Sequence, residues 1–252
     1  MNWPSLFLCW LIFMPMHTSA QVHSADRVMQ LSGDVGGAIY QTSGVYKNTS
    51  TSTSVLPYLY AENDYIFSRV DTFGVKLLPL GEGQLEVVAR YSLEGYYPGR
   101  QTIPLNIAQR NNPQPVGIGT FQTYEWGAIF FYALKDLVSL GDTEEITYAL
   151  EFKSGPLTFY PQFGLERRSK KYITHLYGVT DAESLASGLP AYAPTASVNG
   201  TLGLAAEMSL GKNLVAIYQY KMRRLDSAIT NSPLVGAHHN QSLQFLALAY
   251  RL

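Results

Sequence analysis

Strict alternation of apolar and polar residues is the feature that most constrains this chain. Between residues 145 and 153 every second position, Ile146, Tyr148, Leu150 and Phe152, is apolar. A period of two is typical of a β-strand, because successive side chains of a strand point to opposite faces. Ser154-Gly155 then predicts a tight turn into a second alternating run at 157–166. The two runs together predict a β-hairpin.

The same pattern recurs along the rest of the chain. Residues 198–209 and 214–223 alternate on either side of a turn at 211–213, and residues 245–252 alternate at the end. Residues 85–92 show the pattern more weakly. The alternation predicts about ten strands, beginning near Asp34, with twelve as the alternative.

Alternating strands fit two architectures: a soluble sandwich, whose apolar faces meet in a core, and a membrane barrel, whose apolar faces meet lipid. The runs are about ten residues long, which suits a tilted membrane span better than a sandwich strand of about five or six residues. Tight turns alternate with long polar loops at 173–196 and 225–240, and the 18 Tyr and 11 Phe gather near strand ends. These features favour an all-β, closed antiparallel transmembrane β-barrel.

The last strand adds a second argument for a barrel. Its apolar face consists of Leu246, Leu248, Tyr250 and Leu252, and the chain stops inside this strand. A terminal apolar residue with Tyr two positions before it resembles the assembly signal of bacterial outer-membrane proteins, although those proteins usually end in Phe. We therefore expect Leu248, Tyr250 and Leu252 to act as the assembly signal and the protein to reside in the bacterial outer membrane.

The first twenty residues predict a secretory signal peptide. An apolar run, LFLCWLIFMPM, precedes a short polar segment that ends at Ala20, and no charged side chain occurs before Asp26. Eleven residues are too few to span about 30 Å of hydrocarbon. The only cysteine, Cys9, lies in this run. We expect residues 21–252 to form a single barrel domain without a thiol.

The polar faces of the strands would line the barrel. Both signs of charge occur there, so the charges can pair across a narrow barrel and fill it, which disfavours a general porin. The expected inward set is Glu86, Arg90, Glu145, Glu151, Lys153, Glu166, Arg168, Glu207, Lys221 and Arg223.

Composition and histidine placement exclude several other functions. A net charge of -1 offers no basic excess for nucleic acid. His238-His239 lies in a polar loop without a third ligand at useful spacing, so we expect no metal and no cofactor. His175 could activate a serine at the outer rim, as in lipid hydrolases, but the sequence nominates no partner for it. We therefore expect no catalytic residue.

A basic group follows the strand that ends near residue 168. Arg167, Arg168, Lys170 and Lys171 fall where that strand leaves the membrane. Lipopolysaccharide phosphates are suitable counter-ions for such a group. The alternative is an ordinary solvated strand end.

Several segments resemble one family of barrels. Tyr177-Gly178-Val179-Thr180, followed by Ser187-Gly188-Leu189-Pro190-Ala191-Tyr192, is similar to the long-loop signature of the MipA/OmpV family of outer-membrane proteins. Pro57-Tyr58-Leu59-Tyr60 before Tyr65-Ile66-Phe67, and then Phe73-Gly74-Val75, agree with it. The resemblance covers most of residues 21–252, except for 93–115.

The resemblance implies a small barrel that acts as a scaffold, because the family includes a protein that brings a murein lytic transglycosylase together with a penicillin-binding murein synthase. The alternative is a small-solute channel or a surface adhesin. The candidate signature residues are Tyr177, Gly178, Val179, Gly188, Leu189, Pro190 and Tyr192.

The sidedness of the signature loop conflicts with a role in murein metabolism. Counting back from a periplasmic C-terminus puts loop 173–196 on the outer surface, whereas murein enzymes work on the inner side. Either this count is wrong, or the loop folds into the barrel and the short turns form the scaffold surface. Within the loop Gly178 and Gly188 would give backbone freedom and Pro190 a fixed bend, and the alternative is that the motif contacts a partner directly.

Overall fold

The structure is a computed structural model that describes residues 31–47, 49–95 and 106–252. The predicted signal peptide, residues 1–20, lies outside the described residues. The strands are β1 (Ser32–Thr42), β2 (Ser52–Glu62), β3 (Ile66–Arg69), β4 (Thr72–Leu80), β5 (Gly83–Arg90), β6 (Pro115–Tyr124), β7 (Gly127–Asp136), β8 (Asp142–Leu150), β9 (Phe152–Ser154), β10 (Leu157–Arg168), β11 (Ser197–Ser209), β12 (Leu214–Arg224) and β13 (Asn240–Arg251). The helices are α2 (Lys170–Tyr177), α3 (Asp181–Ser187) and α4 (Ser227–Thr230). None of the described helices has the length and apolar character needed to cross a membrane.

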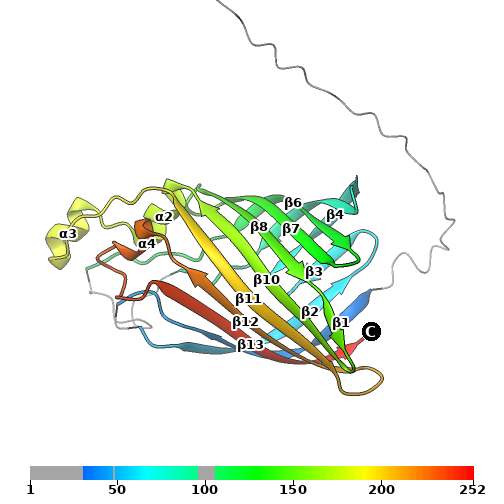
Figure 1. Ribbon diagram of the computed structural model, residues 1–252. Helices are drawn as coiled ribbons and strands as arrows, with labels where there is room; N and C mark the ends of the chain where they lie inside the picture. The colour runs from blue at the N-terminus through cyan, green and yellow to red at the C-terminus, as the bar shows by residue number, and fades with distance from the viewer. Residues whose placement is uncertain (1–30, 48, 96–105) are drawn as a thin grey trace, which may run out of the picture.

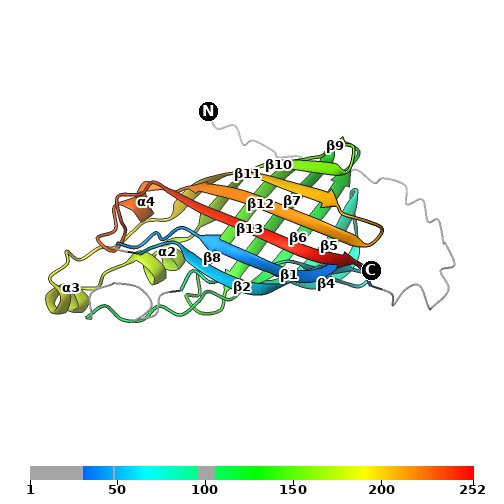
Figure 2. The same cartoon turned by 90° about the horizontal axis from the view of Figure 1, so that it is seen from below.

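The strands form one antiparallel sheet that closes on itself. Each strand pairs with its neighbours in the chain, and β13 returns to pair with β1, from Asp34 opposite Arg251 to Thr42 opposite Leu243. β8 and β9 both pair with β10 and are separated only at Glu151, so they act as one strand of a twelve-stranded wall. Figures 1 and 2 show this wall wrapped around a common axis. The predicted closed barrel is confirmed, with the larger of the two predicted strand numbers.

The sequence pattern is weakest in the N-terminal half, where strands are hard to count. β3 has only four residues, too few to show a period. In β6, Gly117 and Gly119 replace side chains that would mark the alternation. A Cβ at Gly119 would collide with the ring of Tyr132, which occupies the space that the glycine leaves inside the barrel. Packing across strands therefore hides the period in this region.

The alternation separates an outer apolar face from an inner face. In β13, Leu246, Leu248 and Tyr250 are 57%, 53% and 56% exposed, whereas Ala247 and Ala249 between them are 1% and 2% exposed. A sandwich would bury the apolar set, so the exposed leucines decide against it. The large apolar side chains around the wall therefore face lipid.

The two ends of the barrel differ. The links between β9 and β10 and between β11 and β12 are short and lie at the end where β13 stops, whereas α2, α3 and α4 gather at the opposite end (Figures 1 and 2). Gly155 in the first of these links has φ +60°, a conformation that favours glycine. Outer-membrane barrels keep short turns in the periplasm and long loops outside. The loop at 173–196 therefore lies at the end opposite the C-terminus, as the sequence predicts.

Stacked aromatic rings line the outer wall towards the short-turn end. Tyr124 stacks on Trp126 with ring centroids 4.7 Å apart, Trp126 on Tyr148 at 5.0 Å, and Tyr148 on Phe163 at 5.9 Å. Aromatic side chains of this kind favour the boundary between hydrocarbon and water. The row therefore marks a membrane interface.

Closure of the barrel should depend on the last strand. Removing 246–252 deletes partners of both β1 and β12, and Tyr250→Asp puts a carboxylate on the lipid face. A basic residue on the lipid face at the bilayer midplane costs about 2–4 kcal/mol, and Asp costs less. Damage to the assembly signal should therefore have the larger effect. We expect the deletion to abolish outer-membrane insertion, Tyr250→Asp to reduce it and Tyr250→Phe to preserve it.

The measurement is membrane fractionation with gel mobility before and after boiling. A truncated protein that reached the outer membrane and kept a heat-dependent mobility shift would contradict this role of β13.

Candidate functional site

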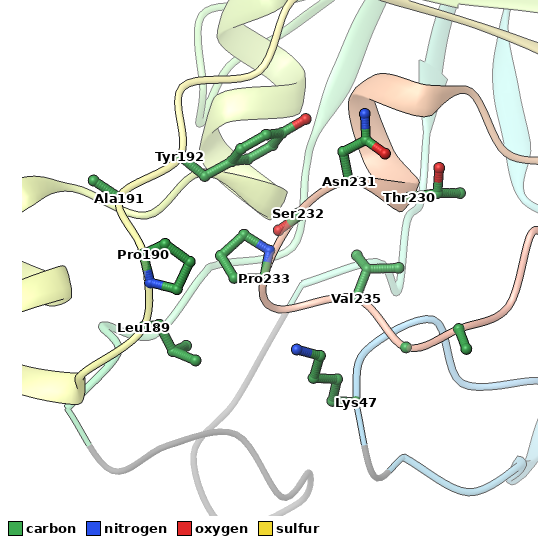
Figure 3. A pocket seen from close by; sticks show the side chains of 12 residues that line it. Lys47, Leu189, Pro190, Ala191, Tyr192, Thr230, Asn231, Ser232, Pro233 and Val235 are labelled. Atoms are coloured by element: carbon green, nitrogen blue, oxygen red, sulfur yellow. The ribbon is translucent and has the colours of Figure 1, made fainter.

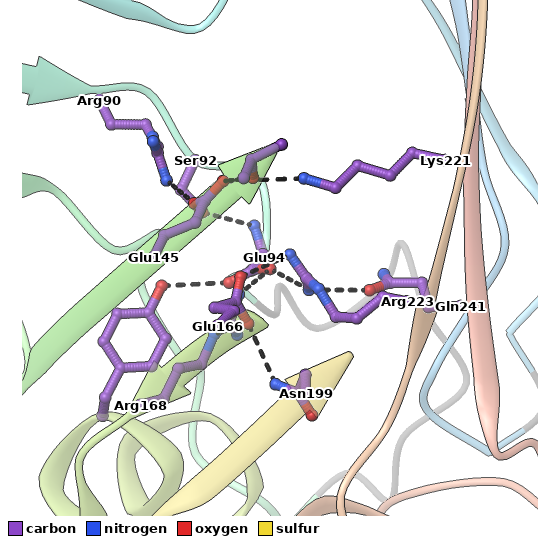
Figure 4. Close-up of polar contacts among 12 residues, drawn as sticks. Arg90, Ser92, Glu94, Glu145, Glu166, Arg168, Asn199, Lys221, Arg223 and Gln241 are labelled. Atoms are coloured by element: carbon purple, nitrogen blue, oxygen red, sulfur yellow. Dashed lines mark hydrogen bonds and ion pairs between the residues drawn. The ribbon is translucent and has the colours of Figure 1, made fainter. Parts of the chain in front are cut away.

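Paired charges occupy the inside of the barrel towards the long loops (Figure 4). Arg90 Nη1 of β5 lies 2.6 Å from Glu145 Oε2 of β8, and Lys221 Nζ of β12 lies 3.8 Å from Glu145 Oε1. Strands from different parts of the wall therefore meet through their side chains, which confirms the predicted pairing across the lumen. We call the whole group the mouth network: Arg90, Glu94, Glu145, Glu166, Arg168, Lys221 and Arg223.

Glu94 joins a long loop to this network. Arg168 Nη2 and Arg223 Nη1 donate to its Oε1 at 2.7 Å and 2.8 Å, and the hydroxyl of Tyr172 in α2 donates to its Oε2 at 3.1 Å. Burial alone would raise the pKa of Glu94, but the two guanidinium groups outweigh it and hold that pKa well below its ordinary value. One carboxylate thus connects the β5–β6 loop, two strands and a helix.

Glu166 forms the other negative centre of the mouth network. Glu166 and Arg168 both point inward because they are two positions apart on β10. Arg168 Nε lies 2.7 Å from Glu166 Oε1, and Arg223 Nη2 donates to Glu166 Oε2 at 3.1 Å. Asn199 of β11 donates to Glu166 Oε1 at 3.0 Å and accepts from the N–H of Asp226 at 2.9 Å. A second long loop is thereby held by the barrel interior.

Two further groups of ion pairs lie inside the barrel, farther from the long loops than the mouth network. Arg69 bonds to Glu86 at 2.8 Å and stacks on the rings of Phe67 and Phe121. At the short-turn end, Arg251 donates to Asp34 of β1 and Glu207 of β11 at 2.9 Å and 2.6 Å. The last strand is thus tied by side chains as well as by its backbone.

Two residues of the predicted inward set lie at the open rim of the barrel. Lys153 has a side chain that is 76% exposed and pairs with Glu151 at the rim of the short turns. The strand is interrupted at Glu151, but Lys153 lies opposite Thr158 of β10, which lies opposite Glu207 of β11, so the inward parity continues past the interruption. Lys153 therefore keeps the predicted parity but ends at the rim, not deep in the lumen.

The long loops fold into an apolar cap over the mouth network. Ile173 and Leu176 of α2 and Ile229 of α4 are 0% exposed. They pack with residues of the β1–β2 and β5–β6 loops and of the β12–β13 loop. The buried members of the cap are Val45, Tyr46, Ile107, Tyr172, Ile173, Leu176, Tyr177, Val179, Leu225, Ile229, Leu234 and Val235.

The signature residues build this cap. Tyr177 and Val179 are buried, and the backbones of Val179 and Tyr192 exchange two hydrogen bonds of 2.9 Å. The Tyr192 hydroxyl donates to the carbonyl of Ala228 at 3.0 Å, and Leu189 packs against the apolar cluster. These contacts hold the signature loop against α4.

The two signature glycines have structural roles. Gly188 ends α3 with φ +75°, a left-handed conformation that favours glycine. At Gly178 a Cβ would lie 2.6 Å from the carbonyl oxygen of Thr174, so any side chain would disturb the end of α2.

Glu183 fastens the signature loop to the β5–β6 loop. It forms a capping box with Thr180, and its Oε1 accepts from Arg110 Nη2 at 2.8 Å and from the N–H of Ala108 at 3.0 Å. The spacing Thr180-x-x-Glu183 is a helix-start signal that sequence reasoning could have used. No such local signal exists for Arg110 or Glu94, because their partners are distant in the chain.

A shallow groove of about 560 Å³ crosses the surface of the cap (Figure 3). Leu189, Pro190 and Tyr192 line one side, and 230–233 with 235–237 line the other, with Lys47 at the edge. Three signature residues therefore border an open surface, and two of them, Leu189 and Tyr192, also pack against the apolar cluster.

A family model for "MltA-interacting protein MipA" matches residues 35–252. The chain belongs to the MipA family. Among its relatives, YiaT of Escherichia coli strain K12, which is named as an outer membrane protein, is 23% identical over 214 residues, covering 83% of this chain and 86% of YiaT. The MltA-interacting protein of the same strain is 24% identical over 223 residues, covering 86% and 88%. Family membership and the lipid-facing barrel place this MipA-family protein in the outer membrane.

The predicted lipopolysaccharide contact changes once the fold is known. Arg168 is 3% exposed and bonded to Glu94 and Glu166 inside the MipA-family barrel, so the prediction is wrong for this residue. Arg167 faces outward and pairs with Glu144 at 2.9 Å, and Lys170 and Lys171 are exposed. For Arg167, Lys170 and Lys171 the contact stays a prediction.

The histidines form no catalytic or metal arrangement in the described part of this MipA-family chain. A ring nitrogen of His175 lies 3.0 Å from the carbonyl oxygen of Asn111, so the imidazole contacts backbone rather than a serine. The described residues contain no group of three side chains that could hold a metal ion.

Removing the charge of Glu94 should loosen the cap. Because Glu94→Gln leaves Arg168 and Arg223 with one partner fewer, we expect a loss of about 1–3 kcal/mol in the free energy of unfolding at neutral pH. The wild-type contribution is present above the ordinary carboxyl pKa of about 4.3 and declines as the pH falls further, because the folded-state pKa is lowered. Glu94→Gln should therefore flatten the acid dependence.

Urea unfolding in detergent at several pH values measures both effects. Glu82→Gln, in an exposed short turn, is the matched control. Equal unfolding midpoints for Glu94→Gln and Glu82→Gln would show that Glu94 does not stabilise the cap.

Proposed function

We propose that this protein is a non-enzymatic scaffold that holds a murein lytic transglycosylase, and through it a penicillin-binding murein synthase, at the outer membrane. The single observation that carries this proposal is the mouth network, whose ion pairs link β5, β8 and β12 across the lumen beneath a folded cap. A barrel filled in this way gives little room for transport. A relative is named for interaction with MltA, which supports the choice of partner.

The short-turn end is the surface that suits a periplasmic partner. Three neighbouring turns carry exposed carboxylates, Asp64, Glu82 and Glu125, whereas Lys212 carries the opposite charge on the β11–β12 turn and Lys153, paired with Glu151, lies beside the β9–β10 turn. A rim with two signs of charge favours one orientation of a bound protein. On this view the signature loop serves the cap, and the partner binds at the opposite end.

Two further expectations belong to the same proposal. Residues 1–20 direct secretion, and Arg167, Lys170 and Lys171 contact lipopolysaccharide phosphates where β10 leaves the membrane. Both roles would keep the short-turn end towards the murein layer.

A surface adhesin is the second candidate, because the cap presents the groove beside Pro190 and an 89% exposed Leu185 on α3. Adhesion would use the long-loop end, whereas the scaffold uses the short-turn end. Variants of the two ends therefore separate the two functions.

We expect the detergent-solubilised protein to retain murein hydrolases from periplasmic extract. The combined variant Asp64→Lys, Glu82→Lys and Glu125→Lys should lose most of this binding, because it reverses one side of the rim. Lys170→Glu with Lys171→Glu, at the opposite end, should bind like wild type. Repeated absence of murein enzymes from the wild-type pull-down, identified by mass spectrometry, would overturn the scaffold proposal.

A further inference from the structure

Part of the barrel wall is incomplete on the side of the long loops. β2 pairs with β1 along its whole length, but with β3 only at Tyr60, Ala61 and Glu62. Beyond these pairs one backbone hydrogen bond runs from the N–H of Val70 to the carbonyl of Leu59. Among the described residues no strand lies along the remaining edge of β2, residues 52–58. We call this unpaired edge the lateral notch.

The lateral notch lies at the depth of the lipid hydrocarbon. Val55 in its middle is 77% exposed and lies opposite Ile39 of β1, which is 50% exposed and lies opposite Leu246 of β13. These three side chains belong to the outer apolar band. An open sheet edge is normally absent from this layer, because each unsatisfied backbone group there costs several kcal/mol.

Two residues indicate that the edge is kept free of a strand. Pro57 lies within the notch and has no N–H, so a strand added there would lack a hydrogen bond. Val70 has φ +64°, which is rare for a β-branched residue, and it turns the chain from β3 into β4 below the top of β2.

The inner face behind the notch carries a cluster of aromatic and apolar side chains, with Asp71 close enough to act on the Tyr40 hydroxyl. Tyr58 of β2 and Phe245 of β13 are buried there with their ring centroids 6.0 Å apart, and Tyr40 lies 5.1 Å from Phe245. Val70 packs against the same cluster, so the strained turn is part of its wall. Tyr40 and Leu56 stay partly exposed and border the notch from inside.

We propose that the lateral notch admits the hydrocarbon chain of a membrane amphiphile, which lies against Tyr40, Tyr58 and Phe245. Lipid is the material that meets Val55 from outside, and Pro57 disfavours a strand from another protein or from a second copy. The aromatic cluster then supplies an apolar surface continuous with the bilayer. This site is independent of the scaffold surface at the short turns.

Tryptophan quenching tests the proposal in the intact barrel. Trp126 is the only Trp after residue 20, so Trp126→Phe gives a silent background. Tyr58→Trp then places a reporter behind the notch, and Phe130→Trp places a matched one on the inner face of β7, which is paired on both sides. Both proteins are reconstituted in phosphatidylcholine vesicles, with or without bromine on the acyl chains.

We expect brominated chains to remove most of the fluorescence of the Tyr58→Trp protein and little of that of the Phe130→Trp protein. Adding Leu56→Lys should restore fluorescence, because an ammonium group at the inner edge disfavours hydrocarbon. Variants are compared only if they keep the heat-dependent gel mobility, and Tyr40→Trp replaces Tyr58→Trp if the latter does not. Equal quenching of the two reporters would overturn the proposal. Absence of quenching in both, which is the result expected if a protein strand covers the notch, would overturn it as well.

Discussion

The structure depends on where its charges can be placed. A charge on the lipid face is costly, so the charged residues of the strands turn inward, where the low dielectric tolerates them only in pairs. Glu145 meets both Arg90 and Lys221, and Glu166 meets Arg168 and Arg223. The cost of placing charge on the lipid face therefore both shapes the barrel wall and fills its interior with ion pairs.

The long loops use this charged interior as their foundation. Glu94 in a loop accepts from Arg168 in the wall, and Asn199 in the wall accepts from the N–H of Asp226 in a loop. Above these contacts, Ile173 and Ile229 belong to a separate apolar core. The outer end is consequently a folded layer rather than a set of independent loops. A protein closed in this way presents its ends, and the lateral notch, for interaction.

The sequence was sufficient for the fold because its main signal is local. Alternation in β10 to β13 and the pattern at Tyr250 gave the barrel, its lipid face and its closing strand. The contacts of Glu94 could not be predicted from local sequence signals, because its partners Arg168 and Arg223 are 74 and 129 residues away. Arg168 was predicted in two ways, for the lumen from strand parity and for lipopolysaccharide from its basic neighbours, and its 3% exposure shows that parity gave the right face.

Single-channel recording of the purified barrel in planar bilayers tests the central claim most directly. The claim is that paired charges and the cap fill the barrel, so that it works through its surfaces. The account predicts no steady conductance for the wild-type protein at neutral pH. A steady conductance proportional to voltage would contradict a filled lumen and favour the small-solute channel.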